Sequence, residues 1–243
     1  MECTDRRLFV AWRSPERQIV PIGELRQIED SSGLRYEFAY LKAAESALDQ
    51  YRLPGFPDLS VRYTSGTLFP TFANRTMPRH RHDYDAFVSR LGLCSPVDPF
   101  EVMERSGGRR QTDRIEVFGE PSFEDGALTA LFFLRGIRHI DGAEDRVAQL
   151  AVGQELGLRL EPDNPVNPLA LTLHNDGEEL LGYLPDYLVD TAHDLLDLNG
   201  SLPTVKVDHV NDHDTPFHMR LLCRLTSPWP EGYDPLAKLE TII

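Results

Sequence analysis

Short strand-like segments, each closed by turn residues, fill the second half of the sequence and constrain its fold most. Between residues 128 and 225, apolar or alternating stretches are separated by segments rich in Gly, Pro, Asn and Asp, a pattern typical of short antiparallel strands. The segment Asn175-Asp176-Gly177 lies between two such stretches and predicts a tight β-hairpin. We expect six strands and two helices in this region, which together indicate a small OB-like barrel.

The first half predicts a smaller antiparallel sheet joined to short helices. Residues 34–40 alternate between apolar and polar positions, which places Leu34 and every second residue after it on one buried face. Asp98 before Pro99 predicts the start of a short helix, because Asp caps the first turn and Pro suits its first position. The chain is therefore expected to be an α+β protein.

Charge is distributed unevenly along the chain, whose formal net charge is −14. The first 125 residues carry 17 Lys and Arg against 20 Asp and Glu, whereas the remainder carries 8 against 19. This change indicates a domain boundary near residues 119–126. In so acidic a chain, any nucleic-acid contact must use a local basic patch. We predict a first domain over residues 1–120, a barrel domain over residues 127–228 and a tail over residues 229–243.

The three cysteines, Cys3, Cys94 and Cys223, are too few and too widely spaced for a disulfide framework or a zinc clip. Such usage is typical of a reducing compartment. The sequence begins without the apolar run of a signal peptide. No stretch approaches the roughly 20 apolar residues of a membrane span. We therefore expect a cytoplasmic protein that does not bind a membrane.

Two motifs of the second half match the order of a known domain family. Residues 161–165 read Glu-Pro-Asp-Asn-Pro, and residues 182–185 read Gly-Tyr-Leu-Pro directly before an expected helix. Together with the strands between them, these motifs resemble the HIRAN domain over about residues 130–226. The resemblance implies an OB-like, six-stranded barrel that binds single-stranded DNA or captures a DNA end with a free 3′-hydroxyl.

The resemblance also implies positions for the DNA contacts. Arg138 and His139 lie where the family places a basic and an aromatic side chain against phosphate and base. Tyr183 matches another position that can face DNA, and Asn167 is the last of the implied groove residues. Three more arginines are expected to neutralise phosphates beside these residues, namely Arg135, Arg159 and Arg220.

The turn after residue 165 departs from the family pattern. A Tyr-Asp pair that holds the terminal nucleotide is replaced by Val166 and Asn167, and an Asn before the next strand is replaced by Leu169. An Asn carbonyl can replace the Asp acceptor in part. Loss of the Tyr removes a stacking surface worth about 1–3 kcal/mol per base.

A second resemblance covers the first half. Residues 69–78 read Phe-Pro-Thr-Phe-Ala-Asn-Arg-Thr-Met-Pro and precede helix-like residues 83–93 and Asp98-Pro99-Phe100. This order resembles the N-terminal subdomain of HipA-type toxin kinases over about residues 7–106. The sequence shows no phosphate-binding loop or catalytic loop of a kinase core. The resemblance therefore implies a docking domain for a protein partner such as a kinase, nuclease or helicase subunit.

Residues 75–82 form the most basic octet of the chain, with three Arg and two His. A basic run in so acidic a sequence suggests a contact with phosphate or with an acidic partner. The candidate residues are Arg75, Arg79, Arg81, Arg109 and Arg110.

No hydrolase, metalloprotease or nucleotide-binding motif is found, so the sequence predicts a protein that is not an enzyme and uses no cofactor or metal. The first hypothesis is a DNA-binding module for single strands or 3′ ends. The alternative is a regulator, an antitoxin or a defence-system subunit, that restrains a HipA-like kinase or another effector and has lost DNA binding. The least favoured hypothesis is a metal enzyme at His209 and His213, whose spacing falls on a strand end.

Overall fold

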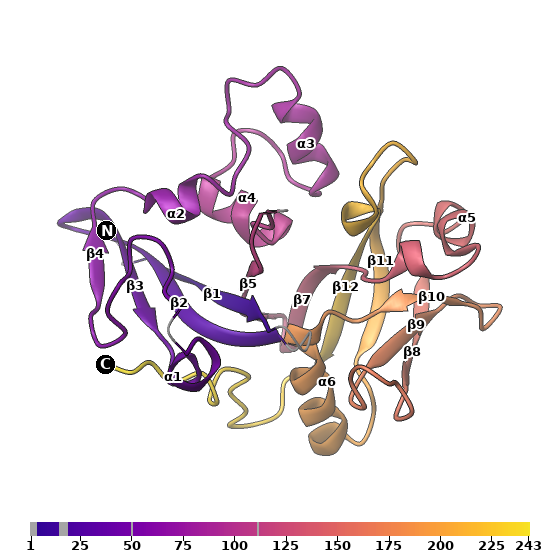
Figure 1. The fold of residues 1–243 in the computed structure, drawn as a ribbon. Helices are drawn as coiled ribbons and strands as arrows, with labels where there is room; N and C mark the ends of the chain where they lie inside the picture. The colour runs from indigo at the N-terminus through magenta and orange to yellow at the C-terminus, as the bar shows by residue number, and fades with distance from the viewer. Residues whose placement is uncertain (1–3, 15–18, 50, 111) are drawn as a thin grey trace. The chain divides into compact units, whose positions relative to one another are not determined.

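The computed structural model describes residues 4–14, 19–49, 51–110 and 112–243, and Cys3 therefore lies outside the described residues. The protein has the expected α+β fold, with two antiparallel sheets and a few short helices (Figure 1). It divides into two compact units. The first contains Met1–Asp85, Ser95–Glu120 and Leu236–Ile243, and the second contains Ala86–Cys94 and Pro121–Pro235.

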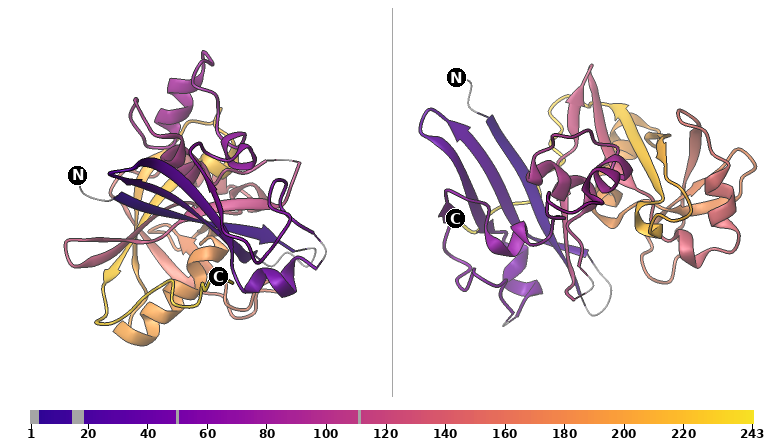
Figure 2. Two further views of the ribbon diagram at one scale, coloured as in Figure 1. Left: turned by 90° about the vertical axis from the view of Figure 1, so that its left-hand side faces the viewer. Right: turned by 90° about the horizontal axis from the view of Figure 1, so that it is seen from above.

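The first unit is built on a single sheet with the strand order β4-β3-β2-β1-β5, whose strands lie side by side in Figure 2. Its strands are β1 (Thr4–Arg13), β2 (Ile19–Asp30), β3 (Gly33–Tyr40), β4 (Tyr63–Ser65) and β5 (Ile115–Gly119). As the alternation predicts, Tyr36, Phe38 and Tyr40 are buried on one face. Leu34 is 43% exposed, because it lies at the hairpin end of β3.

Short helices cover the first unit's core. Their bounds are α1 (Ala43–Ala47), α2 (Pro70–Ala73) and α4 (Pro99–Ser106). Helix α3 (Tyr84–Arg90) lies between α2 and α4 in sequence, but from Ala86 onward it belongs to the second unit. The predicted cap of α4 is present, since the Asp98 carboxylate accepts a hydrogen bond from the Phe100 N–H at 2.9 Å. The helix expected over residues 41–51 is shorter, because Asp49 adopts a positive φ of 46° that ends the helix.

The second unit is built on a sheet with the order β10-β9-β8-β11-β12-β7-β6. Its strands are β6 (Ser122–Glu124), β7 (Ala127–Phe133), β8 (Glu155–Leu160), β9 (Leu171–His174), β10 (Leu180–Tyr183), β11 (Thr204–Val210) and β12 (Leu221–Pro228). An antiparallel bridge between Arg135 and Tyr183 joins the end of β7 to β10. The sheet thereby closes into a barrel, and β6 is an additional strand on the start of β7.

Helical segments lie between the strands of the barrel, namely η1 (Ile137–His139), α5 (Ala143–Ala148), α6 (Asp186–Asn199) and η2 (Phe217–Met219). The strand expected over residues 216–225 was wrong in its first part, because residues 217–219 form a 3-10 turn. Pro216 has no N–H for a strand ladder, and the Arg220 guanidinium holds the turn by binding the carbonyl of Thr215.

Apolar side chains fill the barrel. Leucines alternate inward along β9, where Leu171 and Leu173 are buried, and α6 adds Leu188 and Leu195 to the same cluster. Complete burial raises the pKa of the Cys223 thiol in this core. Because the interior is occupied by its own side chains, a ligand of this unit must bind on the outer face or at the ends.

The chain returns to the first unit at its C-terminus. The Ile242 N–H donates to the Tyr40 carbonyl at 3.0 Å, and the Lys42 N–H donates to the Glu240 carbonyl at 2.9 Å. In contrast, Trp229 belongs to the second unit, where its indole N–H donates to the Tyr233 carbonyl. The segment expected as one tail is thus divided between the two units. None of the described helices is long and apolar enough to span a bilayer.

Candidate nucleic-acid interface

The point of barrel closure brings together Arg135, Gly136 and Tyr183. The Arg135 N–H donates to the Tyr183 carbonyl at 3.0 Å, and the Tyr183 N–H donates back at 2.9 Å. Gly136 has a φ of +80°, and a Cβ atom there would lie 2.8 Å from Cδ2 of Tyr183. A Cβ on Gly182 would lie 2.4 Å from the Arg135 carbonyl oxygen. The two glycines therefore allow the Tyr183 ring to lie against the backbone of residue 136.

Tyr183 is part of a row of paired residues that runs from β8 across β9 and β10 to Arg135, two residues after the end of β7. Thr172 is paired with Arg159 on one side and with Tyr183 on the other, and Tyr183 is bridged to Arg135. Directly paired residues share a face of the sheet, and Leu171 beside Thr172 points into the core. The row therefore lies on the outer face and, at about 4.8 Å per strand, spans roughly 14 Å.

The hydroxyl group of Tyr183 is held in its neutral form. Partial burial and, second, the charge of Glu161 raise the pKa of Tyr183 above its usual value. A tyrosine is protonated at neutral pH even without this shift, and the raised pKa keeps the hydroxyl as a hydrogen-bond donor to still higher pH. The Glu161 carboxylate itself accepts a hydrogen bond from the side-chain amide of Asn164.

The Glu-Pro-Asp-Asn-Pro turn is rigid because Asn164 organises its backbone. The Asn164 side-chain oxygen accepts hydrogen bonds from the N–H groups of Val166 and Asn167, at 2.9 and 3.0 Å. The Asn167 side-chain oxygen in turn accepts the Leu169 N–H at 3.0 Å. This turn presents an apolar surface, since Val166 is 58% and Leu169 is 47% exposed.

The 3-10 turn η1 presents Arg138 and His139 to solvent directly after Gly136. Nε of Arg138 donates to Nε2 of His139 at 3.0 Å. The flat imidazole ring of His139 thus lies beside the Arg138 guanidinium. The positions that the resemblance assigns to phosphate and base are therefore exposed.

Arg159 and Arg220, two of the expected phosphate contacts, differ in whether a phosphate can reach them. Arg159 is exposed and forms a 2.9 Å ion pair with the exposed carboxylate of Glu178, which a phosphate can replace. Arg220 is 4% exposed, and its guanidinium binds the carbonyl groups of Thr215 and His213 and the Glu144 carboxylate. Arg220 therefore has a structural position, and we leave it out of the candidate interface.

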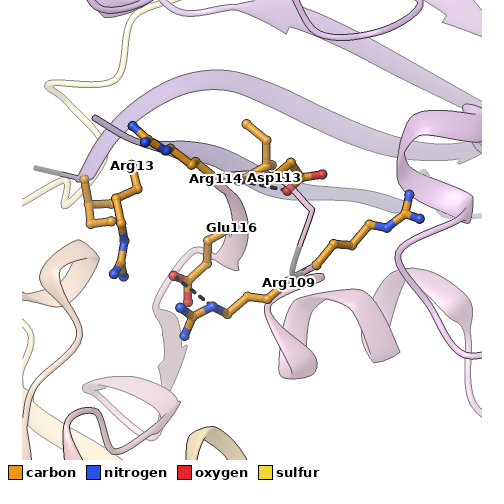
Figure 3. Close-up of a pocket in the computed structure, with 8 residues that line it drawn as sticks. Arg13, Arg109, Asp113, Arg114 and Glu116 are labelled. Atoms are coloured by element: carbon orange, nitrogen blue, oxygen red, sulfur yellow. Dashed lines mark hydrogen bonds and ion pairs between the residues drawn. The ribbon is translucent and has the colours of Figure 1, made fainter. Parts of the chain in front are cut away.

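The basic octet of the first unit does not form one patch. Arg75 is almost fully buried and binds Asp113 through both terminal nitrogens, at 3.1 and 2.6 Å. Arg79 donates to the Val97 carbonyl, and Arg81 is paired with Asp83. Arg109 and Arg110 instead line a cavity of the same unit (Figure 3).

The histidines that had suggested a metal enzyme have other surroundings. His209 lies 3.1 Å from the side-chain oxygen of Asn211, and His213 is exposed beside Asp214. Among the residues that the structure describes, no three His, Cys, Asp or Glu side chains gather as metal ligands.

Sequence reasoning missed three contributors to the interface, which are Gly136, Glu161 and Thr172. Gly136 could have been noticed because it stands two residues before Arg138 in the same short segment. Thr172 gives no such signal, because its place in the row depends on the pairing of β9 with both neighbours.

Two solved structures resemble this chain in part. A Lactobacillus plantarum protein, solved as a structural-genomics target, is 20% identical with a TM-score of 0.35, covering 42% of this chain and 96% of its own. The HIRAN domain of human HLTF is 16% identical with a TM-score of 0.33, covering 43% of this chain and 80% of its own. No family model matches the sequence, and no curated protein matches it. At this level of similarity, any functional argument depends on the chain's own residues.

Proposed function

We propose that the second unit is a non-enzymatic module that binds single-stranded DNA, including its 3′ end, along the outer row of the barrel. The observation that carries this proposal is the position of Tyr183, an aromatic ring supported from behind by Gly136 and flanked on its own row by Arg135 and Arg159. Aromatic platforms beside cationic side chains are typical of proteins that bind single strands.

In this proposal the ring and the arginines have separate tasks. Tyr183 stacks on an unpaired base, and its neutral hydroxyl donates to a sugar or phosphate oxygen. Arg135, Arg138 and Arg159 each neutralise a phosphate, and the exposed ring of His139 supports the neighbouring base. Backbone contacts of this kind position the strand but do not read its sequence.

The 3′ end is proposed to lie at the turn that contains Asn167. Its side-chain oxygen already accepts the Leu169 N–H, and it has a second lone pair for a terminal hydroxyl. Val166 and Leu169 offer apolar contact in place of a stacking ring. This end contact therefore contributes less affinity than the Tyr183 platform.

Fluorescence anisotropy with a labelled single-stranded oligonucleotide tests the proposal. At low salt, the wild-type chain should bind a 3′-hydroxyl oligonucleotide more tightly than the same oligonucleotide blocked by a 3′-phosphate. Tyr183→Ala should weaken binding about 5-fold to 160-fold, because stacking contributes about 1–3 kcal/mol per base. Tyr183→Phe keeps the ring and separates stacking from the hydroxyl contact.

Arg224→Gln is the matched control, because it removes the same charge as Arg138→Gln from an outward position on β12 that pairs with Asp208. Absence of binding by the wild type at micromolar concentration would end the proposal. Equal losses in the Arg138 and Arg224 variants would show that only overall charge matters.

A further inference from the structure

The first unit contains a cavity of about 210 Å³ where β1 ends and β5 begins (Figure 3). Arginines dominate its described lining, and the acidic groups there are fewer. The charged lining residues are Arg13, Arg109, Arg110, Arg114, Asp113 and Glu116. This composition is unusual in a chain whose net charge is −14.

Asp113 contributes little negative charge to the cavity. Both of its carboxylate oxygens are bound by the guanidinium of Arg75, whose side chain is 4% exposed and does not belong to the lining. Glu116 is the other carboxylate of the described lining, and its Oε2 lies 3.9 Å from Nε of Arg109 (Figure 3). The lining therefore keeps an excess of positive charge.

The backbone around the cavity is fixed by the sheet. The Arg13 N–H donates to the Arg114 carbonyl at 2.8 Å, which extends the ladder between β1 and β5 by one rung. The Ile115 N–H donates to the Asp113 carboxylate at 3.1 Å and holds the start of β5. Arg13 and Arg114 are thus attached to a rigid edge of the sheet, and a site on this edge is formed before any ligand arrives.

We propose that this cavity binds a phosphate-class anion, either free phosphate or diphosphate or the phosphate groups of a nucleotide. The volume of about 210 Å³ is many times the roughly 10–15 Å³ that one water molecule needs. It is smaller than the roughly 300–1,000 Å³ of pockets for drug-sized ligands, so the phosphates enter and a nucleoside stays outside. Guanidinium groups match phosphate oxygens in geometry and stay charged at every physiological pH.

Isothermal titration of the full chain with phosphate, diphosphate and a nucleoside diphosphate, at constant ionic strength, tests this site. Diphosphate should bind, and acetate, titrated separately as a carboxylate control, should not. Equal affinity for diphosphate and nucleoside diphosphate would assign the site to free diphosphate, whereas tighter binding of the nucleoside diphosphate would assign it to a nucleotide. Absence of heat with all three would overturn the proposal.

Three variants connect the binding to this cavity. Arg110→Gln and Arg114→Gln should each weaken binding about tenfold or more, because each removes a charge-assisted contact. Glu116→Gln should tighten binding several-fold by removing the opposing carboxylate, an effect that mere loss of folding cannot produce. Arg52→Gln, which removes the same charge outside the lining, should bind as the wild type does.

The outcome is independent of DNA binding by the other unit, because Tyr183→Ala should leave phosphate affinity unchanged. If Arg52→Gln weakens binding as much as Arg114→Gln, or if Glu116→Gln weakens it, the cavity is not the site.

Discussion

Tyr183 depends on the residues that make room for it. Gly136 adopts a φ of +80°, and its missing side chain leaves the space that the tyrosine ring uses. This arrangement couples a backbone requirement to a binding surface, so one substitution should affect both stability and affinity.

Gly136→Ala therefore tests the coupling. A positive φ costs an L-residue about 1–2 kcal/mol, and the new Cβ would also displace the Tyr183 ring. We expect lower stability in urea unfolding and weaker binding of single-stranded DNA in anisotropy measurements.

Gly153→Ala is the matched control for this change. Gly153 has a φ of +84°, and no other residue comes within 4 Å of the place where its Cβ atom would lie. The Gly153→Ala variant should lose a similar amount of stability and bind DNA as tightly as the wild type does. Equal loss of affinity in both variants would contradict the role assigned to Gly136.

For Arg220 we predict that a substitution lowers stability and leaves DNA affinity unchanged. Its guanidinium binds two backbone carbonyl groups and Glu144, and it lies 5.1 Å from the ring of Phe217. Arg220→Gln should lower the free energy of unfolding by about 2–3 kcal/mol, because buried acceptors lose their donor. DNA affinity of the folded protein should stay unchanged. Arg224→Gln, at a half-exposed ion pair, should cost less than about 1 kcal/mol.

For single residues, the sequence predicted which side chains are candidates for function better than it predicted which of them are buried. Tyr183 and Arg138 stand in recognisable motifs, and the structure leaves Arg138 exposed. Arg75 and Arg220 look like surface arginines in the sequence, but Asp113, 38 residues away, binds Arg75, and the preceding turn together with the distant Glu144 binds Arg220. Burial of an arginine depends on acceptors that come from other elements, which no local pattern reveals.

Among the elements, the C-terminal segment extends the first unit. Its bridge from Thr241 to Leu41 and its hydrogen bonds to Tyr40 and Lys42 continue the edge beside β3. Arg62 also donates to the Ile243 carbonyl at 2.9 Å. The segment thus covers backbone groups that would otherwise face solvent.

Deletion of residues 236–243 should expose these groups. Hydrogen exchange should speed up at the Lys42 amide, which loses the Glu240 carbonyl as its acceptor. Amides of β9 and β12 in the barrel serve as the internal reference and should exchange at the wild-type rate. Unchanged protection of Lys42 would show that the segment does not hold this edge.

Elements with strong local signals were predicted, and those without them were not. The Asp98 cap and the hairpin at Asn175 specify α4 and the β9–β10 turn through short-range chemistry. The strands β4 and β6 have three residues each and exist only through pairing with β3 and β7. A three-residue strand has no periodicity that could distinguish it from a loop.

The whole molecule is acidic, and this limits how its interface binds DNA. The second unit holds most of the negative charge, while the proposed contacts use three exposed or half-exposed arginines, Arg135, Arg138 and Arg159. Few phosphates are neutralised, so affinity should be modest and should depend on salt less steeply than in a basic protein.

A salt titration measures this directly. For single strands the logarithm of the binding constant falls by about 0.7 per neutralised phosphate, which gives a slope of about −2 for three contacts. Arg159→Gln should reduce the slope by about 0.7, and Arg224→Gln should leave it unchanged. A slope steeper than about −4 would require a larger basic surface than the barrel's outer row provides.

The fold class was confirmed, whereas the interleaving of the two units was not foreseen. Charge asymmetry predicts a boundary near residue 120, because composition changes there. Residues 86–94 belong to the second unit through tertiary contacts such as the hydrogen bond from Asn211 to the Arg90 carbonyl. A long-range contact of this kind leaves no trace in local composition.

The leucine-filled interior of the barrel has one more consequence. A strand bound on the outer row, as proposed, is not enclosed and keeps one side in water. A second protein can therefore contact the open side of the same strand while this chain holds the 3′ end, so that the end is marked rather than sealed off.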